Sequence, residues 1–204
     1  MSFAMPSIPS SSTTQDSTIE YVEEYTYLGQ IISPTEITNK EINNRINLAW
    51  NRFWSLKEVM KNPLVPLKYK SKTFNSCILP VMSYGCQTWS LTKHNLHQLQ
   101  TCQHNMERSI LHIKLRDRID LKFIRKQTRI TDVTYCIKKL KWKWAGHIVR
   151  CKNDRSRDVM ECPRHNKRNK GRQRRRWEDD IRRIADITWT RQAVLVCIAF
   201  SGKV

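Results

Sequence analysis

The stretch that decides the fold is residues 38–56, TNKEINNRINLAWNRFWSL. Its apolar side chains recur at intervals of three and four residues: Ile42, Ile46, Ala49, Phe53 and Leu56. This spacing places them on one face of an α-helix. Thr38, with Glu41 three residues later, can form a capping box at the helix start. The stretch therefore predicts an amphipathic helix and a mostly α-helical chain.

Two further helices are predicted beyond this one. Pro63 breaks the first helix, and a second begins near Leu67. Pro80 predicts a kink or an early end of this second helix. A third helix is predicted over residues 92–110, where apolar residues again have helical spacing. The three helices together predict a small antiparallel bundle over residues 36–113.

The N-terminal part of the chain has a different pattern. Residues 1–18 are rich in Ser, Thr and Pro with little to bury, so we expect a disordered lead. Residues 19–35 contain aromatic and branched side chains that meet Gly29 and resume at Ile31. This pattern predicts a short hairpin.

The pattern after residue 113 stays helical but becomes strongly basic. Residues 114–183 contain 25 Lys and Arg against 9 Asp and Glu, whereas residues 1–113 contain 10 against 8. Because a solvated surface usually carries both signs, an excess in one segment predicts a polyanionic partner that binds through counterion release. We therefore expect residues 114–193 to bind nucleic acid, namely RNA, an RNA–DNA template–primer or duplex DNA.

The elements predicted in this basic region are helices at residues 121–128, 132–148 and 174–185 and a mobile loop at residues 152–170. Its cations and one tryptophan are the candidate nucleic-acid-binding residues: Lys138, Lys139, Lys141, Trp142, Lys143, Arg150, Lys167, Arg168, Lys170, Arg172, Arg174, Arg175 and Arg176. Trp144 and Trp177 have the helical spacing of core anchors, which leaves Trp142 as the candidate for stacking on a base.

Composition also indicates where the protein acts. No apolar stretch is long enough to cross a bilayer, and the start of the chain lacks a secretory signal. An anionic membrane surface is a competing polyanion, but the arginine clusters lack the wide apolar face of a membrane-bound helix. The seven cysteines form no C-x-x-C pair, so we expect reduced thiols and an intracellular protein. The run KRNKGRQRRR at residues 167–176 is typical both of a nuclear import signal and of nucleic-acid contact.

Two short pairs of residues could ligate zinc: His147 with Cys151, and Cys162 with His165. The interval between the pairs is not that of a usual zinc knuckle. We favour the alternative that His147 packs beside Trp144 and that the cysteines are incidental. No metal is therefore expected at these residues.

The chain contains one pair of adjacent aspartates, Asp179 and Asp180. Neighbouring positions of a helix splay apart, which disfavours a metal shared between the two carboxylates. Salt bridges to Arg175, Arg176 or Arg183 are the favoured explanation for the pair.

Four short blocks stand in fixed order along the chain: Tyr27-Leu28-Gly29, Tyr84–Trp89 (YGCQTW), Gly146–Arg150 (GHIVR) and Gly171–Trp177 (GRQRRRW). Their order and spacing resemble the region that follows the catalytic palm in reverse transcriptases of non-LTR (LINE-type) retrotransposons, nearest the RTE and BovB-like group. The resemblance covers about residues 19–193. Gln87 and Gln173 depart from it, because the family usually has an acidic residue and a proline there.

The resemblance implies a role for each part of the chain. Tyr27, Leu28 and Gly29 would form a primer-grip-like element, and the Glu41-Ile42-x-x-Arg45-Ile46 helix would open a thumb-like bundle. The family's Ala-Asp-Asp signature, whose carboxylates hold Mg²⁺, should precede the primer grip, but nothing before Tyr27 matches it. The Mg²⁺ would belong to the missing palm, so we expect no cofactor, no catalysis and no small-molecule substrate in this chain.

We therefore expect a non-catalytic remnant of a retrotransposon reverse transcriptase that binds RNA or a template–primer. One alternative is a host-recruited helical protein that binds DNA or RNA independently of any polymerase. Another is a translated pseudogene fragment without function. The observation behind this last alternative is that residues 194–204 turn abruptly apolar and look unrelated to the family.

Overall fold

The computed structural model describes five stretches of the chain: residues 11–14, 17–33, 37–150, 177–185 and 188–193. The protein is mostly α-helical, with short antiparallel strand pairs toward the N-terminus, which confirms the predicted fold class. Contacts divide the chain into two compact units, Met1–Glu41 and Ile42–Val204. None of the described helices is long and apolar enough to cross a bilayer.

The N-terminal unit contains two antiparallel strand pairs. β1 (Ser11–Thr14) pairs with β2 (Ser17–Glu20), and β3 (Tyr25–Tyr27) pairs with β4 (Gln30–Ile32). The second pair confirms the predicted hairpin. The first pair lies largely in the segment expected to be disordered. Ser and Thr offer little apolar surface to bury, but β-branched Thr favours an extended backbone, and composition alone missed that preference.

The turn between β3 and β4 consists of Leu28 and Gly29. Their φ angles are 48° and 75°. Positive φ at both central residues is typical of the type I′ turn, which joins two strands with a twist that matches theirs. The backbone N–H of Ile31 donates to Oε2 of Glu41 at 2.9 Å. The hairpin is thereby tied to the first turns of the helix that follows it.

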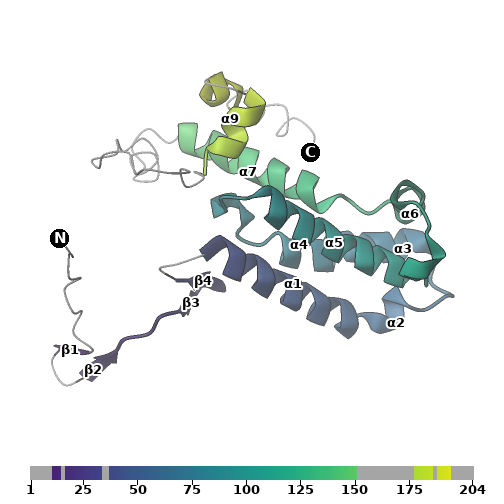
Figure 1. Cartoon of the computed structure of the whole chain (residues 1–204), viewed down its shortest axis with the longest axis horizontal. Helices are drawn as coiled ribbons and strands as arrows, with labels where there is room; N and C mark the ends of the chain where they lie inside the picture. The colour runs from purple at the N-terminus through teal and green to yellow at the C-terminus, as the bar shows by residue number, and fades with distance from the viewer. Residues whose placement is uncertain (1–10, 15–16, 34–36, 151–176, 186–187, 194–204) are drawn as a thin grey trace. The chain divides into compact units, whose positions relative to one another are not determined.

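The larger unit is built on the helices predicted from the sequence. Their bounds are α1 Ile37–Ser55, α2 Lys57–Met60, α3 Leu67–Thr73, α4 Leu79–Met82 and α5 Lys93–Ile110. Figure 1 shows α1, α4 and α5 with roughly parallel axes. Phe53, Met60, Phe74, Met82 and Leu99 are completely buried in the core of this bundle. The three predicted helices are confirmed, and α2 is a short addition to them.

The second predicted helix is distorted at Pro80 but does not stop there. A π-helical segment, η1 (Phe74–Ile78), separates α3 from α4. A proline has no N–H to donate, and its ring crowds the carbonyl four residues earlier, here that of Ser76. One wide π turn before the ring relieves this crowding. The predicted distortion is confirmed, and the helix continues to Met82.

The basic region contains further short and long helices. They are η3 (Leu115–Asp117), α6 (Leu121–Thr128), α7 (Val133–Arg150), α9 (Asp179–Ala185) and a helical stretch at residues 189–193, and a further short helix, η2 (Cys86–Thr88), lies before α5. The helices predicted at residues 121–128 and 132–148 are confirmed, and that at 174–185 is confirmed over its described part. The predicted loop at 152–170 and the tail at 194–204 lie outside the described residues.

α7 belongs to two hydrophobic cores. Its first half packs Val133 and Ile137 into the bundle core. Its second half packs Ala145 against Ile181 and Ala185 of α9, together with Trp189 and Ala193, in a smaller core. α7 therefore packs on the bundle as a further long helix, and it lies along α5 in Figure 1. Residues on both sides of residue 113, the predicted boundary, contribute to the bundle core, because the basic helix α7 covers an apolar face of the three-helix bundle.

A buried polar cluster holds α5 against the start of α7. Nε2 of Gln103 donates to Oε1 of Glu107 at 2.8 Å and to the carbonyl of Thr131 at 3.0 Å. Oε1 of Gln103 accepts from the N–H of Val133 at 2.7 Å. Burial raises the pKa of Glu107, although hydrogen bonds from Thr128 and Gln103 oppose the shift. The cluster satisfies the polar atoms of Gln103 at a site without solvent, as burial requires.

Replacing Gln103 by alanine is expected to lower the free energy of unfolding by about 2–3 kcal/mol, because it leaves buried partners without hydrogen bonds and opens a cavity. Urea denaturation followed by circular dichroism measures this loss. Gln100→Ala is the matched control, since Gln100 is half-buried on the same helix and should change the stability by less than about 0.5 kcal/mol. Equal losses in the two variants would contradict the structural role of the cluster.

Asp132 caps α7 and pairs with Arg125. Its Oδ1 accepts from the N–H groups of Thr134 at 2.6 Å and Tyr135 at 3.1 Å, and its Oδ2 lies 2.5 Å from a guanidinium nitrogen of Arg125. Burial alone would raise the pKa of Asp132. The hydrogen bonds from Thr134 and Arg125, the Tyr135 N–H and the Arg125 charge outweigh burial and lower it.

The variant Asp132→Asn removes the charge but keeps a residue that caps helices about as well. A lowered pKa in the folded state means that the charge stabilises the fold above the ordinary pKa, and that this contribution is lost as pH falls through the folded-state pKa. We expect Asp132→Asn to be less stable than the wild type by about 1–2 kcal/mol at neutral pH. Denaturation across a pH series should show this difference disappearing in acid, and a pH-independent difference would contradict the ion-pair assignment.

Candidate nucleic-acid interface

The solvent side of α7 carries the best-defined candidate interface. Lys138, Lys139, Lys143 and Arg150 are all exposed on this helix. Lys139 and Lys143 are four positions apart, so their side chains are neighbours on one face. Like charges at this spacing repel each other, and the repulsion is relieved when a polyanion binds.

The exposed cations outnumber the acids around them. Residues 114–150 contain twelve Lys and Arg, of which ten are exposed. The acids of this stretch are used locally: Asp117 accepts from the N–H of Lys114 at 2.7 Å, Asp120 caps α6, and Asp132 pairs with Arg125. The surface that remains is strongly positive and suits the phosphate backbone of a nucleic acid.

Two exposed aromatic side chains lie among these cations in the sequence. Phe123 on α6 is 50% exposed, and Tyr135 on α7 is 54% exposed. Exposed aromatic rings beside cations are the combination on which nucleobases stack. Sequence reasoning missed both residues because it searched for tryptophan. The signal available in the sequence was helical spacing, which places each ring away from the buried face of its helix.

Lys141 does not belong to this surface, although the sequence placed it among the contact residues. Only 3% of Lys141 is exposed. Its Nζ donates to the carbonyl of Trp89 at 2.9 Å and to Oδ2 of Asp180 at 2.7 Å, and it lies 5.0 Å from the ring centroid of Trp177. This ammonium makes its contacts inside the fold, so a phosphate cannot reach it. The helical period turns it inward while Lys139 and Lys143 face solvent.

The three tryptophans predicted to flank this region have different surroundings. Trp177 packs on the smaller core and meets the ring of Trp189 edge-on, with the ring centroids 6.4 Å apart. Its indole N–H donates to the carbonyl of Gln87. This confirms its predicted role as an anchor. Trp142 packs on the same core, so it is not the exposed platform that the sequence suggested. Trp144 stacks on His147 with ring centroids 5.3 Å apart, which confirms the predicted packing of His147 beside it.

The motif blocks meet one another in the structure. Arg45, from the block that opens α1, lies over the ring of Tyr84 with its guanidinium carbon 4.5 Å from the centroid. The same YGCQTW block provides the carbonyls of Gln87 and Trp89 that bind Trp177 and Lys141. These blocks therefore brace the helices against each other.

The primer-grip-like residues are at the tip of the hairpin in the N-terminal unit. Tyr27, Leu28 and Gly29 are all exposed there. Leu28 is more exposed than Tyr27, and its left-handed backbone holds it at the turn. This exposure is compatible with contact to a nucleic-acid end.

Several predicted site residues lie outside the described residues. They are Lys167, Arg168, Lys170, Arg172, Arg174, Arg175 and Arg176 among the cations, and Cys151, Cys162 and His165 among the zinc candidates. His147 is described, and it is exposed. Within the described stretches no group of three metal-ligating side chains comes together.

The described cysteines are all free thiols: Cys77, Cys86, Cys102 and Cys136. Burial raises the pKa of Cys86 to about 12 and the pKa of Cys102 to about 12. Both thiols are therefore neutral near pH 7 and unsuited to nucleophilic chemistry.

Asp180 pairs with a residue that the sequence did not suggest. Its described partner is Lys141, which lies 39 positions earlier on α7. Glu178 pairs with Arg182 at 3.1 Å on the surface of α9. The packing of α9 against α7 in the smaller core brings Asp180 to the buried cation, a contact that local helical spacing cannot reveal.

Lys141 and Lys143 offer a matched pair of variants on one helix. Lys141→Met should lower the free energy of unfolding by about 2–4 kcal/mol, because it deprives the half-buried carboxylate of Asp180 and a buried carbonyl of their cation. Lys143→Gln should change it by less than about 0.5 kcal/mol but weaken nucleic-acid binding. Chemical denaturation and fluorescence anisotropy measure the two effects. A Lys141→Met variant that is as stable as the wild type but binds nucleic acid more weakly would show that Lys141 contacts nucleic acid, contrary to its structural assignment.

Comparison with known proteins relates most of the chain to a mobile element. No protein-family model and no solved structure matches it. The chain is 32% identical over 179 residues to the uncharacterized transposon-derived protein F52C9.6 of Caenorhabditis elegans. The match covers 85% of this chain and 63% of that relative, so the chain spans less than two thirds of the relative's length. The chain is thus similar, over most of its residues, to a protein derived from a transposon.

Proposed function

We propose that this chain is a non-catalytic, nucleic-acid-binding portion of a non-LTR retrotransposon reverse transcriptase, equivalent to its thumb and basic C-terminal region. It would hold RNA or an RNA–DNA template–primer by the phosphate backbone. The observation that carries the proposal is the row of exposed cations on α6 and α7, presented on helices that are fixed by buried contacts.

Two independent observations support the origin. The first is the similarity to a transposon-derived protein over most of the chain. The second is the resemblance of the blocks at Tyr27–Gly29, Tyr84–Trp89 and Gly146–Arg150 to the region behind the palm of these polymerases. The helical bundle that follows the hairpin also has the architecture expected of a thumb.

The chemistry of the surface suits a clamp that holds the nucleic-acid backbone more than a site that recognises a base sequence. Lys and Arg contacts to phosphate position a nucleic acid but carry little sequence information. A polymerase that copies a whole element needs this kind of grip, since the template changes at every step. Phe123 and Tyr135 add faces on which a base of any identity can stack.

The proposal assigns nucleotidyl transfer to a palm that is not part of these residues. That reaction needs carboxylates that hold two Mg²⁺ ions at the primer terminus. The role left to this chain is to keep template and primer in place. The nucleic-acid complex would depend on charge and would weaken steeply with salt.

A host-recruited helical protein that binds nucleic acid independently of any polymerase is the second candidate. The observation in its favour is that the larger unit buries its own hydrophobic core, from Ile42 to Ile137. Such a unit has the core of an independent domain. Selective binding to one duplex DNA sequence would favour this candidate over the clamp.

Fluorescence anisotropy with a structured RNA, an RNA–DNA template–primer and a duplex DNA, each across a salt series, tests the proposal. We expect a steep negative salt slope and tighter binding to the RNA-containing probes. The triple variant Lys138→Gln, Lys139→Gln, Lys143→Gln should reduce the salt slope by about 2–3 units and weaken binding to all probes alike. The same measurement on a variant with Arg172, Arg174, Arg175 and Arg176 neutralised tests the predicted basic motif.

The control variant makes the same charge change elsewhere on the bundle. Lys57, Lys68 and Lys93 are exposed lysines outside α6 and α7, and their replacement by glutamine should lower affinity much less. Equal losses in the two triple variants would show that net charge alone drives binding. Absent or salt-insensitive binding would contradict the proposal and favour the alternative of a translated pseudogene fragment.

A further inference from the structure

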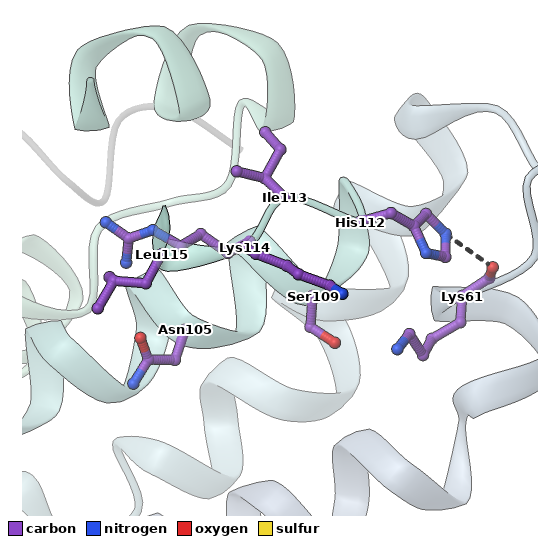
Figure 2. Close-up of a pocket in the computed structure, with 8 residues that line it drawn as sticks. Lys61, Asn105, Ser109, His112, Ile113, Lys114 and Leu115 are labelled. Carbon is purple, nitrogen blue, oxygen red and sulfur yellow. Dashed lines mark hydrogen bonds between the residues drawn. The ribbon is translucent and has the colours of Figure 1, made fainter. Parts of the chain in front are cut away.

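A pocket of about 500 Å³ lies at the C-terminal end of α5. Figure 2 shows side chains from α5, from the end of α2 and from the segment after α5 around it. Its polar lining consists of Lys61, Asn105, Arg108, Ser109, His112 and Lys114. None of the residues that line it is acidic. The pocket therefore gathers cations and hydrogen-bond donors, and the carboxylate of Asp117 accepts from the backbone N–H of Lys114, one of the lining residues.

The walls of the pocket are fixed by the way α5 ends. Asn105, Arg108, Ser109 and His112 follow one another at helical spacing and form one face. His112 takes a left-handed φ of 58°, and the next N–H, of Ile113, returns to the carbonyl of Arg108 at 3.0 Å. This arrangement is a Schellman-type helix end, which satisfies carbonyls that would otherwise be open. A ring nitrogen of His112 then hydrogen-bonds the carbonyl of Lys61 at 3.1 Å, as drawn in Figure 2.

Three cations from different segments reach this pocket. A cation in the last turn of a helix complements the helix dipole, which explains Arg108 by itself. Lys61 stands at the end of α2, a helix of only four residues, and Lys114 lies beyond α5, so the dipole of α5 explains neither of them. In the described part of the chain no carboxylate forms an ion pair with any of these three side chains. The Lys61 ammonium only lies 5.6 Å from the ring of Trp54.

We propose that this pocket binds the terminal phosphate of a nucleic-acid strand. A terminal phosphate monoester carries close to two negative charges at neutral pH, whereas each internal diester carries one, so a pocket with three cationic lining residues favours the end of a strand. The volume lies in the range of pockets that hold a small ligand, which leaves room for the terminal nucleotide as well as its phosphate. This inference rests on the proposed function and adds to it a site that recognises strand ends.

Strands of identical sequence with a 5′-phosphate, a 3′-phosphate or only hydroxyl ends test the proposal by fluorescence anisotropy on the full chain. We expect one phosphorylated strand to bind roughly tenfold more tightly than the hydroxyl strand, since the pocket supplies several charge-assisted contacts. The double variant Lys61→Gln, Arg108→Gln, which spares the exposed cations of residues 114–150, should lose this preference and keep its affinity for the hydroxyl strand within roughly threefold. The control variant Lys57→Gln, Lys68→Gln, Lys93→Gln should keep the preference. Circular dichroism and thermal unfolding of each variant confirm that it is folded.

The outcomes separate this inference from the proposed function. Equal binding of all three strands by the wild type would overturn the pocket assignment while leaving the clamp in place. Failure to bind any strand would overturn both. Adenosine monophosphate added as a competitor should reduce the preference only at millimolar concentration, because it lacks the backbone contacts of a strand. Displacement at micromolar concentration would assign the pocket to a free nucleotide and contradict the proposal.

Discussion

The buried ammonium of Lys141 is the contact on which the arrangement of the basic region depends. It lies where α7 passes from the bundle core to the smaller core formed with α9. A buried cation is stable only while its partners face it, because removing either one leaves a charge away from water. The carbonyl of Trp89 and the carboxylate of Asp180 are those partners. The YGCQTW block, α7 and α9 are therefore coupled, because a shift of any of them would separate the Lys141 ammonium from one of its partners.

This coupling divides the cations of α7 into two groups with different tasks. Lys141 fixes the helix, whereas Lys138, Lys139 and Lys143 face solvent on a helix that is already held in place. A rigid surface of this kind loses little entropy when phosphates bind to it. The buried cluster around Gln103 fixes the start of the same helix. The proposed clamp thus depends on internal polar contacts as much as on surface charge.

Much of the fold follows from local pattern. Helical spacing in residues 38–56 predicts α1, and Pro80 predicts a distortion that the structure resolves as a π turn. Long-range packing is what the pattern cannot supply. Lys141 looks like its basic neighbours in the sequence, and only the approach of Asp180 identifies it as buried. Trp142 was misplaced for the same reason, because the smaller core that covers it comes from residues about forty positions later. The pocket around Arg108 joins segments that are far apart in the sequence, so no motif marks it.

Lysine footprinting can distinguish the buried Lys141 from the exposed lysines of α7. The full chain is acetylated with and without an RNA–DNA template–primer, and the modification of each lysine is quantified by mass spectrometry. We expect Lys138, Lys139 and Lys143 to react in the free protein and to be protected by the nucleic acid, while Lys141 stays unreactive in both states. Reaction of Lys141 at the rate of Lys143, or failure of the template–primer to protect the exposed lysines of α7, would contradict this expectation.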